Sequence, residues 1–157
     1  MELNDETLRF IREHCKDDVR NLALQAPKYP NVDMPVALTQ IAGRQSAAEK
    51  MPSWYAEEGI LYPRHLPLEQ CSSEATARYK ASIIPESSSA ALTDLTGGFG
   101  IDCAFLSPKF HHVTYVERQE ALCEIASHNF PLLGLNHIRM ESLFSIQIWF
   151  RPSSGKL

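Results

Sequence analysis

The residues best suited to chemistry lie between positions 94 and 117. Asp94 ends a short apolar run, and a glycine-rich segment, Thr96-Gly97-Gly98-Phe99-Gly100, follows it. Glycines let a backbone approach a ligand closely, and free N–H groups at a helix start face polar ligand atoms. The Asp94 carboxylate disfavours a pyrophosphate and favours a cation or a donor amine. The segment therefore predicts a binding loop for a ligand that carries positive charge.

A second acid, Glu117, ends the next predicted strand. In dinucleotide-type folds an acid at this point accepts hydrogen bonds from ribose hydroxyls. Arg118 and Gln119 come directly after it, at positions where their side chains would lie beside an adenine. The glycine loop and this acid together favour a nucleoside-cofactor site over the plainer interpretation, a tight strand-to-helix turn.

Two other nucleotide motifs fit the same residues less well. The nicotinamide and flavin fingerprint G-x-G-x-x-G would need a glycine where Cys103 stands, and the phosphate-loop pattern occurs nowhere in the chain. Two alternatives stay open: another Rossmann-type enzyme, which preferential binding of NAD would reveal, and a non-catalytic interaction fragment. Loss of cofactor binding in Asp94→Ala and Glu117→Ala would count against the fragment.

The elements around the loop alternate between strand and helix. We predict strands over 90–95, 113–117 and from 137 to 140, and helices over 101–107 and 119–133 with Gly134 as the C-terminal cap. This order predicts an α/β fold, the start of a Rossmann-like, doubly wound parallel sheet with about three strands. Residues 85–157 are assigned to this incomplete domain.

Residues 1–84 are assigned to an α-helical N-terminal region, because their apolar side chains recur at helical spacing. Prolines 27 and 30 predict a loop, and prolines 52, 63 and 67 predict a long irregular connection. Helices are expected after Asn4, after Asp17, from Asp33 to about Glu49, and from Ser72 or Ser73 to Ile83.

The bulk composition is that of a globular chain of about one domain. It has 157 residues, a net charge of −4 and a pI of about 5.8, so the chain as a whole lacks a basic nucleic-acid footprint. No apolar run reaches the roughly 18 residues that a membrane span needs. The four widely spaced cysteines predict reduced thiols in a cytoplasmic protein, without a metal site.

The pattern Asp94-x-x-x-Gly98-x-Gly100 resembles the first motif of class I S-adenosylmethionine-dependent methyltransferases, and Glu117 matches their acidic second motif. Segments 43–45, 50–54, 68–81 and 94–100 follow one another as in a bacterial family of this class. Its full-length members combine a helical N-terminal region, a Rossmann-like methyltransferase domain and a C-terminal THUMP-like domain. The resemblance covers about residues 3–140.

The resemblance implies S-adenosylmethionine as the cofactor, methyl transfer as the reaction and RNA as the acceptor, the last only through the THUMP-like domain. No catalytic residue is nominated. The cofactor residues that it implies are Asp94, Thr96, Gly97, Gly98, Gly100, Asp102, Glu117 and Arg118. Further residues are nominated for the methionine end of the cofactor or the substrate, on one helix: Ser73, Thr76, Tyr79 and Lys80.

The chain departs from the family pattern at its end. A complete domain has about seven strands, and no Asp-Pro dipeptide occurs here. An acid and a helix are expected in the final segment 141–157, but residues 144–150 alternate like a strand instead. We therefore expect a truncated or frameshifted product with little turnover. A short parallel sheet leaves an open edge, so we also expect a homodimer that covers it or a marginally stable fold.

A basic and aromatic group of residues is a candidate RNA surface. The alternative, ordinary solvated charges and half-buried aromatic rings, is favoured. The group comprises Arg44, Lys50, Trp54, Tyr55, Tyr62, Arg64, Arg78 and Lys80.

Overall fold

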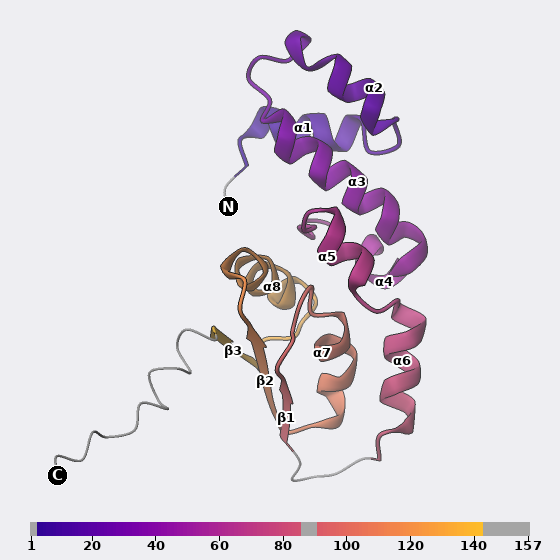
Figure 1. The fold of residues 1–157 in the computed structure, drawn as a ribbon, viewed down its shortest axis with the longest axis vertical. Coiled ribbons are helices and arrows are strands. Elements are labelled where there is room, and N and C mark those ends of the chain that lie inside the picture. The colour runs from indigo at the N-terminus through magenta and orange to yellow at the C-terminus, as the bar shows by residue number, and fades with distance from the viewer. Residues whose placement is uncertain (1–2, 86–90, 143–157) are drawn as a thin grey trace, which may run out of the picture.

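Helices precede the first strand in the computed structural model of the chain, which describes residues 3–85 and 91–142 (Figure 1). They are α1 (Asp5–Glu13), α2 (Val19–Leu24), the 3₁₀ helix η1 (Ala26–Lys28), α3 (Met34–Lys50), α4 (Pro52–Ala56), α5 (His65–Gln70) and α6 (Glu74–Ile83).

The starts of four helices confirm or refine the predicted caps. Asn4, Asp33 and Ser73 each accept a hydrogen bond from the backbone N–H three residues on, at 2.8, 3.2 and 3.2 Å. The helix expected after Asp17 is α2, and Asp18 caps it by accepting from the Asn21 N–H at 2.9 Å. Such caps satisfy N–H groups that have no partner inside the helix.

The predicted irregular connection through prolines 52, 63 and 67 is wrong in part, because α4 and α5 lie within it. Pro52 opens α4, and Pro67 lies in the first turn of α5. Proline suits a first turn because its missing N–H has no partner to lose there. For the same reason Pro27 lies in η1, where a loop was predicted.

The second half of the described chain forms a parallel three-stranded sheet of order β1-β2-β3, which confirms the predicted α/β class. In the register Asp94 lies opposite Tyr115, and Glu117 lies opposite Ser142. The elements are β1 (Ala91–Asp94), α7 (Ile101–Leu106), η2 (Ser107–Lys109), β2 (His112–Glu117), α8 (Glu120–Leu132) and β3 (Ile138–Ser142). The predicted strand pattern of residues 144–150 lies outside the described residues.

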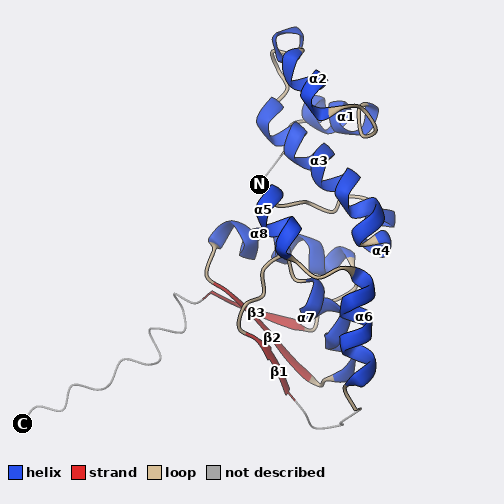
Figure 2. Cartoon of the chain, turned by 45° about the vertical axis from the view of Figure 1, so that its right-hand side comes forward, coloured by secondary structure: helices blue, strands red, loops and turns tan. Residues whose placement is uncertain are grey.

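Helices α7 and α8 cover one face of this sheet (Figure 2). Two successive right-handed crossovers in one direction place both helices on the same side. Val113 and Tyr115 point to that face and are buried, whereas Thr93 and Arg139 on the other face are exposed. In the described residues this sheet and its two helices thus form two layers, and no described strand lies beside the outer edge of β1. The homodimer expected at that edge stays a prediction.

The main core spans the predicted domain boundary near residue 84. Trp54 and Tyr62 pack on Phe99 of the glycine loop, with ring centroids 5.0 and 6.1 Å apart. A second, smaller cluster holds α1, α2 and α3 together around Phe10 and Ile41. The division at residue 84 stays a prediction, while core packing continues across it.

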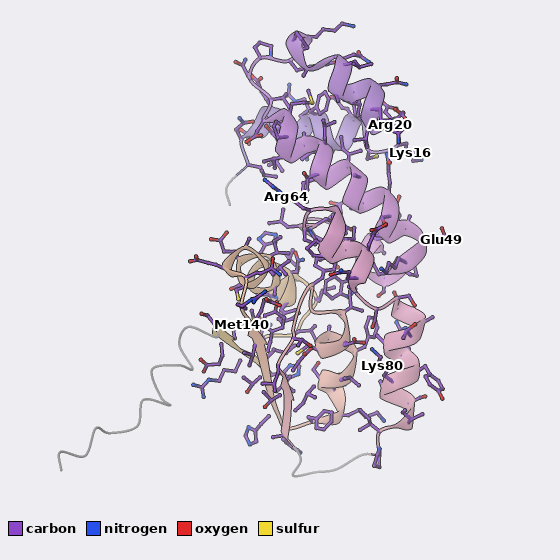
Figure 3. All side chains as sticks on the ribbon, viewed as in Figure 1. Lys16, Arg20, Glu49, Arg64, Lys80 and Met140 are labelled. Carbon is purple, nitrogen blue, oxygen red and sulfur yellow. The ribbon has the colours of Figure 1, made fainter. Side chains whose placement is uncertain are left out.

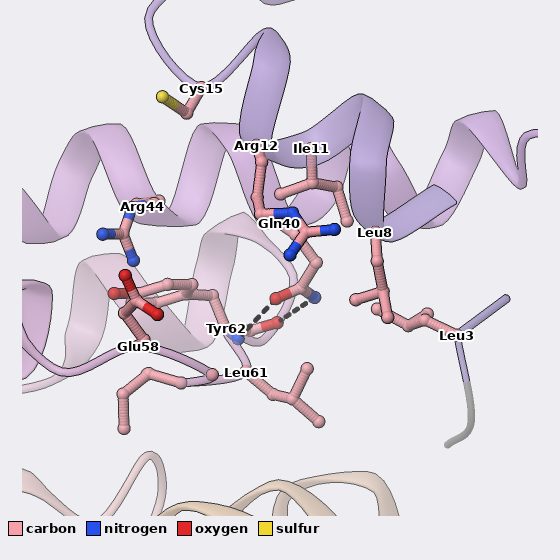
Figure 4. A pocket seen from close by; sticks show the side chains of 12 residues that line it. Leu3, Leu8, Ile11, Arg12, Cys15, Gln40, Arg44, Glu58, Leu61 and Tyr62 are labelled. Atoms are coloured by element: carbon pink, nitrogen blue, oxygen red, sulfur yellow. Dashed lines mark hydrogen bonds between the residues drawn. The ribbon is translucent and has the colours of Figure 1, made fainter. Parts of the chain in front are cut away.

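Two buried amides hold the segment 59–62 between α3 and α8. Gln40 donates to the Tyr62 carbonyl at 3.0 Å and accepts from the Tyr62 N–H at 2.8 Å (Figure 4). Asn129 does the same for Leu61, at 2.8 and 2.9 Å. Each amide replaces the ladder hydrogen bonds that a neighbouring strand would supply.

Replacing the buried Asn129 with alanine should lower the free energy of unfolding by about 2–4 kcal/mol, because the N–H and the C=O of the partly buried Leu61 both lose their partner. Urea denaturation measures the change. Asn136→Ala, at an exposed position, is the matched control and should stay within about 0.5 kcal/mol. A cost below about 1 kcal/mol for Asn129→Ala would contradict the clamp.

Candidate functional site

The glycine loop turns the chain from β1 into α7 with two residues in the left-handed region. Gly98 has φ +54° and Gly100 has φ +92°, conformations that side chains with a Cβ rarely adopt. The Asp94 carboxylate accepts from the Thr96 N–H at 3.1 Å, and the Gly100 N–H donates to Gly97 at 2.8 Å. The first of these bonds fixes the start of the loop to the end of β1.

The side chain of Tyr115 packs against the glycine loop and supports it, a role that the sequence did not predict. The ring is fully buried, and its hydroxyl donates to the Gly98 carbonyl at 2.6 Å. The Gly97 N–H donates to Val116 at 2.9 Å, and an added Cβ at Gly97 would overlap the Tyr115 ring. The glycine at 97 is therefore needed for space, not for its φ.

Gly97→Ala should cost about 1–3 kcal/mol of folding free energy, the usual penalty for overpacking a closed site. A urea melt checks this value. In a Tyr115→Ala background the same substitution should cost much less, because the ring that it meets has gone. An equal cost in both backgrounds would contradict the steric explanation.

Glu117 is buried, with 8% of its surface exposed, and its carboxylate faces the loop. One oxygen accepts from the Gly98 N–H at 2.8 Å, and the other accepts from Arg118 and Gln119 at 2.7 and 2.8 Å. A carboxylate has about four acceptor sites. Glu117 thus organises the backbone and keeps one acceptor site for a ligand hydroxyl.

Asp94 lies among negative charge. Burial raises the pKa of Asp94, the Thr96 N–H lowers it, and the carboxylates of Asp102 and Glu117 raise it further; the Lys80 ammonium opposes them without cancelling the rise. A bound cation would relieve this repulsion. The loop is therefore poised electrostatically for a positively charged group.

Helix α6 contributes the cation of the site. Lys80 reaches from α6 toward α7 (Figure 3), and its ammonium donates to Asp102 Oδ2 at 2.8 Å and to the Ser72 hydroxyl at 2.9 Å. Ser72 donates to the same Asp102 oxygen at 2.8 Å. The other oxygen, Oδ1, is buried and has no partner among the described residues.

A cleft of about 350 Å³ connects these groups, a size within the range of small-molecule sites. Of the residues predicted for the cofactor, it includes Asp94, Thr96, Gly97, Asp102 and Lys80. Its other lining residues are Leu92, Thr93, Leu95 and Leu106.

The remaining predicted residues lie outside this cleft. Gly98, Gly100 and Glu117 form the far side of the loop, and Arg118 is exposed beside Glu117. Ser73 caps α6 and is hydrogen-bonded to Thr76, while Tyr79 is 67% exposed. Of the four residues nominated on α6, the cleft brings Lys80 alone to the glycine loop.

Most cations of the candidate RNA surface are engaged within the chain. Lys50 donates to the Leu68 and Glu69 carbonyls, Arg78 pairs with Glu74, and Lys80 pairs with Asp102. Arg44 lies over the Tyr55 ring. With Trp54 and Tyr62 buried as well, this group favours a structural role over an RNA surface.

A second cavity, of about 340 Å³, lies between α1, α3 and the segment 58–62 (Figure 4). Its lining is mainly aliphatic, with Arg12, Arg44 and Glu58 among its polar residues, and it includes none of the predicted cofactor residues. It is a cavity of the helical region rather than part of the glycine-loop site.

Burial disfavours the reactive thiolate form at Cys71 and Cys103. Burial raises the pKa of Cys71 despite the nearby Lys50, and it raises that of Cys103 to about 12. Among residues 3–85 and 91–142, no three His, Cys, Asp or Glu side chains come together as a metal site. No helix in the same ranges has both the length and the apolar character for a membrane span.

One comparison with known proteins, that with solved structures, bears on this geometry. No family model matches the chain, and no curated protein matches it. Among solved structures it is similar to one from Porphyromonas gingivalis W83, described as a "putative methyltransferase", with a TM-score of 0.68 and 27% sequence identity. The match covers 90% of this chain and 36% of the other, so the chain spans little more than a third of that structure. The fold of this chain is therefore a methyltransferase-like α/β fold.

Proposed function

We propose that the chain is the S-adenosylmethionine-binding part of a class I methyltransferase. The observation that carries this proposal is the set of three carboxylates, Asp94, Asp102 and Glu117, around a glycine loop. Such a site repels a pyrophosphate and attracts a sulfonium and an ammonium group. The likeness to a protein described as a methyltransferase supports the same conclusion.

The residues present fit this cofactor by charge and by space. The cofactor supplies a methyl group on a sulfonium, already activated for transfer. Glu117 has an acceptor site left for a ribose hydroxyl, and Gly98 and Gly100 keep the loop backbone open to close approach. Asp94 would accept hydrogen bonds from the amino group of the cofactor's methionine part. The chain's own contribution is to position and neutralise the cofactor.

RNA is proposed as the methyl acceptor on the resemblance alone. The group that would orient an acceptor is not assigned to any residue here, and the RNA-surface candidates are engaged elsewhere. We therefore expect cofactor binding to be measurable on this chain while methyl transfer to RNA is slow or undetectable.

Calorimetric titration of the chain with S-adenosylhomocysteine, S-adenosylmethionine and NAD tests the proposal. We expect the first two to bind and NAD to bind at least ten-fold more weakly. Glu124→Gln, which removes an exposed charge on α8, is the control and should bind like the parent. A cooperatively folded chain that prefers NAD, or binds none of the three, would overturn the proposal.

A further inference from the structure

The cavity of the helical region is lined by charged side chains that form no ion pair within the described chain. Arg12 and Glu58 have no described hydrogen-bond partner, and Arg44 lies over the Tyr55 ring while no described acceptor takes its N–H groups. We infer that this cavity binds an organic carboxylate with an apolar tail, and that Arg12 and Arg44 hold its carboxylate group. The inference is independent of the proposed function, since the cavity includes none of the predicted cofactor residues.

Two helices bring the two guanidinium groups to this cavity. Arg12 of α1 stands three residues before Cys15, whose carbonyl accepts from the Gln45 side chain of α3 at 3.1 Å. Arg44 directly precedes Gln45, so it reaches the cavity close to the end of α1. Figure 4 shows both arginine side chains extending from their helices toward the segment 58–62. Guanidinium groups suit a carboxylate because their planar N–H groups can donate to both of its oxygens.

The charge of the lining matches a ligand with one negative charge. Its charged residues are Arg12, Arg44 and Glu58, two cations and one anion, which leaves a net charge of +1 (2 − 1). Glu58 is exposed and lies beside Arg44, where it offsets part of the positive charge (Figure 4). A doubly charged group such as a phosphate monoester would leave one negative charge unmatched and would be repelled more strongly by Glu58. The lining therefore favours a single carboxylate.

Tyr62 adds a buried hydroxyl that has no partner in the described part of the chain. The residue is 2% exposed and belongs to the cavity lining. Burial raises the pKa of Tyr62 to about 12, and the charge of Arg44 opposes part of this rise, so the hydroxyl keeps its proton at neutral pH and lies within the field of Arg44. A buried hydroxyl without an acceptor is costly, and a ligand oxygen bound by Arg44 would supply the acceptor.

Aliphatic side chains form much of the remaining wall and suit an apolar tail. Leu8 and Ile11 of α1 line the cavity on one side, and Ile60 and Leu61 line it on another. Leu8 is 40% exposed, so a bound tail would remove apolar surface from water. Each methylene buried in this way strengthens binding by up to about four-fold. The volume of about 340 Å³ is that of a small-molecule site and fits a tail of medium length.

Calorimetric titrations with three probes that share one tail test the inference: octanoate, 1-octanol and octylammonium. We expect octanoate to bind at least ten-fold more tightly than the other two. Arg12→Met should weaken octanoate binding by about ten- to a hundred-fold, since a charge-assisted hydrogen bond is lost, and should change 1-octanol binding by less than about two-fold. Tyr62→Phe should weaken octanoate binding without lowering the melting temperature, because the hydroxyl that it removes has no described partner.

Arg9→Met is the matched control, because Arg9 is exposed on the same helix and does not line the cavity. It should bind the three probes like the parent, and circular dichroism confirms that each variant is folded. Equal binding of octanoate and 1-octanol would show an apolar contact surface in place of a carboxylate site and would overturn the inference. Unchanged octanoate binding in Arg12→Met, an equal loss in Arg9→Met, or a folded parent chain that does not bind octanoate would also overturn it. The proposed function stands in each case, because its test is S-adenosylhomocysteine binding at the glycine loop.

Discussion

Asp94→Asn should make the chain more stable and a poorer cofactor binder. The ionised carboxylate is partly buried and lies near Asp102 and Glu117, so its charge is unfavourable in the folded, unliganded chain. Asparagine keeps an acceptor for the Thr96 N–H and removes the charge. We expect a higher melting temperature at pH 7 together with S-adenosylhomocysteine binding weakened about ten- to a hundred-fold.

The stability gained in Asp94→Asn should depend on pH. Because the pKa of Asp94 is raised in the folded state, its contribution to stability is fully present below the unfolded pKa of about 3.9 and is lost as pH rises through the folded pKa. The gain from Asp94→Asn should therefore be seen at pH 7 and disappear toward pH 4. Thermal melts of both proteins across this range measure it.

Opposite changes in stability and affinity distinguish a ligand-binding acid from a structural one. A structural carboxylate would lose stability when its charge is removed, as its hydrogen bonds weaken. Glu124→Gln should change neither quantity, because Glu124 is exposed on α8. A lower melting temperature for Asp94→Asn at pH 7 would show that the charge stabilises the loop, and the acid-cluster argument would be wrong.

The elements that sequence could predict are those with local signals. The strands ending at Asp94 and Glu117 stand out because apolar and β-branched residues run up to a turn or an acid. The caps at Asn4 and Asp33 are recognisable because each capping side chain stands only three residues before the N–H from which it accepts. Short helices that begin with proline, such as α4, give the same residue signal as a loop.

The parts that sequence missed depend on pairs far apart in the chain. Asn129 reaches Leu61 across 68 positions, and Ser72 reaches Asp102 across 30. Contacts between residues this far apart leave no periodic pattern in a single sequence. The supporting role of Tyr115 is hidden in the same way, because a tyrosine in a strand is ordinary until the glycine loop folds over its ring.

Glu117→Ala should lower the free energy of unfolding by about 3–5 kcal/mol, the largest loss expected from one side chain of the site. Three backbone N–H groups, of Gly98, Arg118 and Gln119, lose a charged acceptor at once, and each such bond contributes about 1.5–3 kcal/mol when it is shielded from water. Partial exposure of the three groups brings the sum below the additive value. Urea denaturation gives the number.

Glu117→Gln separates the acceptor from the charge. Its amide oxygen still serves the N–H groups on one side, so we expect about half of the alanine penalty, while Glu124→Ala should stay within about 0.5 kcal/mol. A cost under about 1 kcal/mol for Glu117→Ala would show that water replaces the carboxylate. Because this acid holds the loop as well as facing the ligand, lost affinity in Glu117→Ala would not by itself identify a ribose contact. The glutamine variant, with its loop largely kept, is the one whose affinity reports on the ribose hydroxyls.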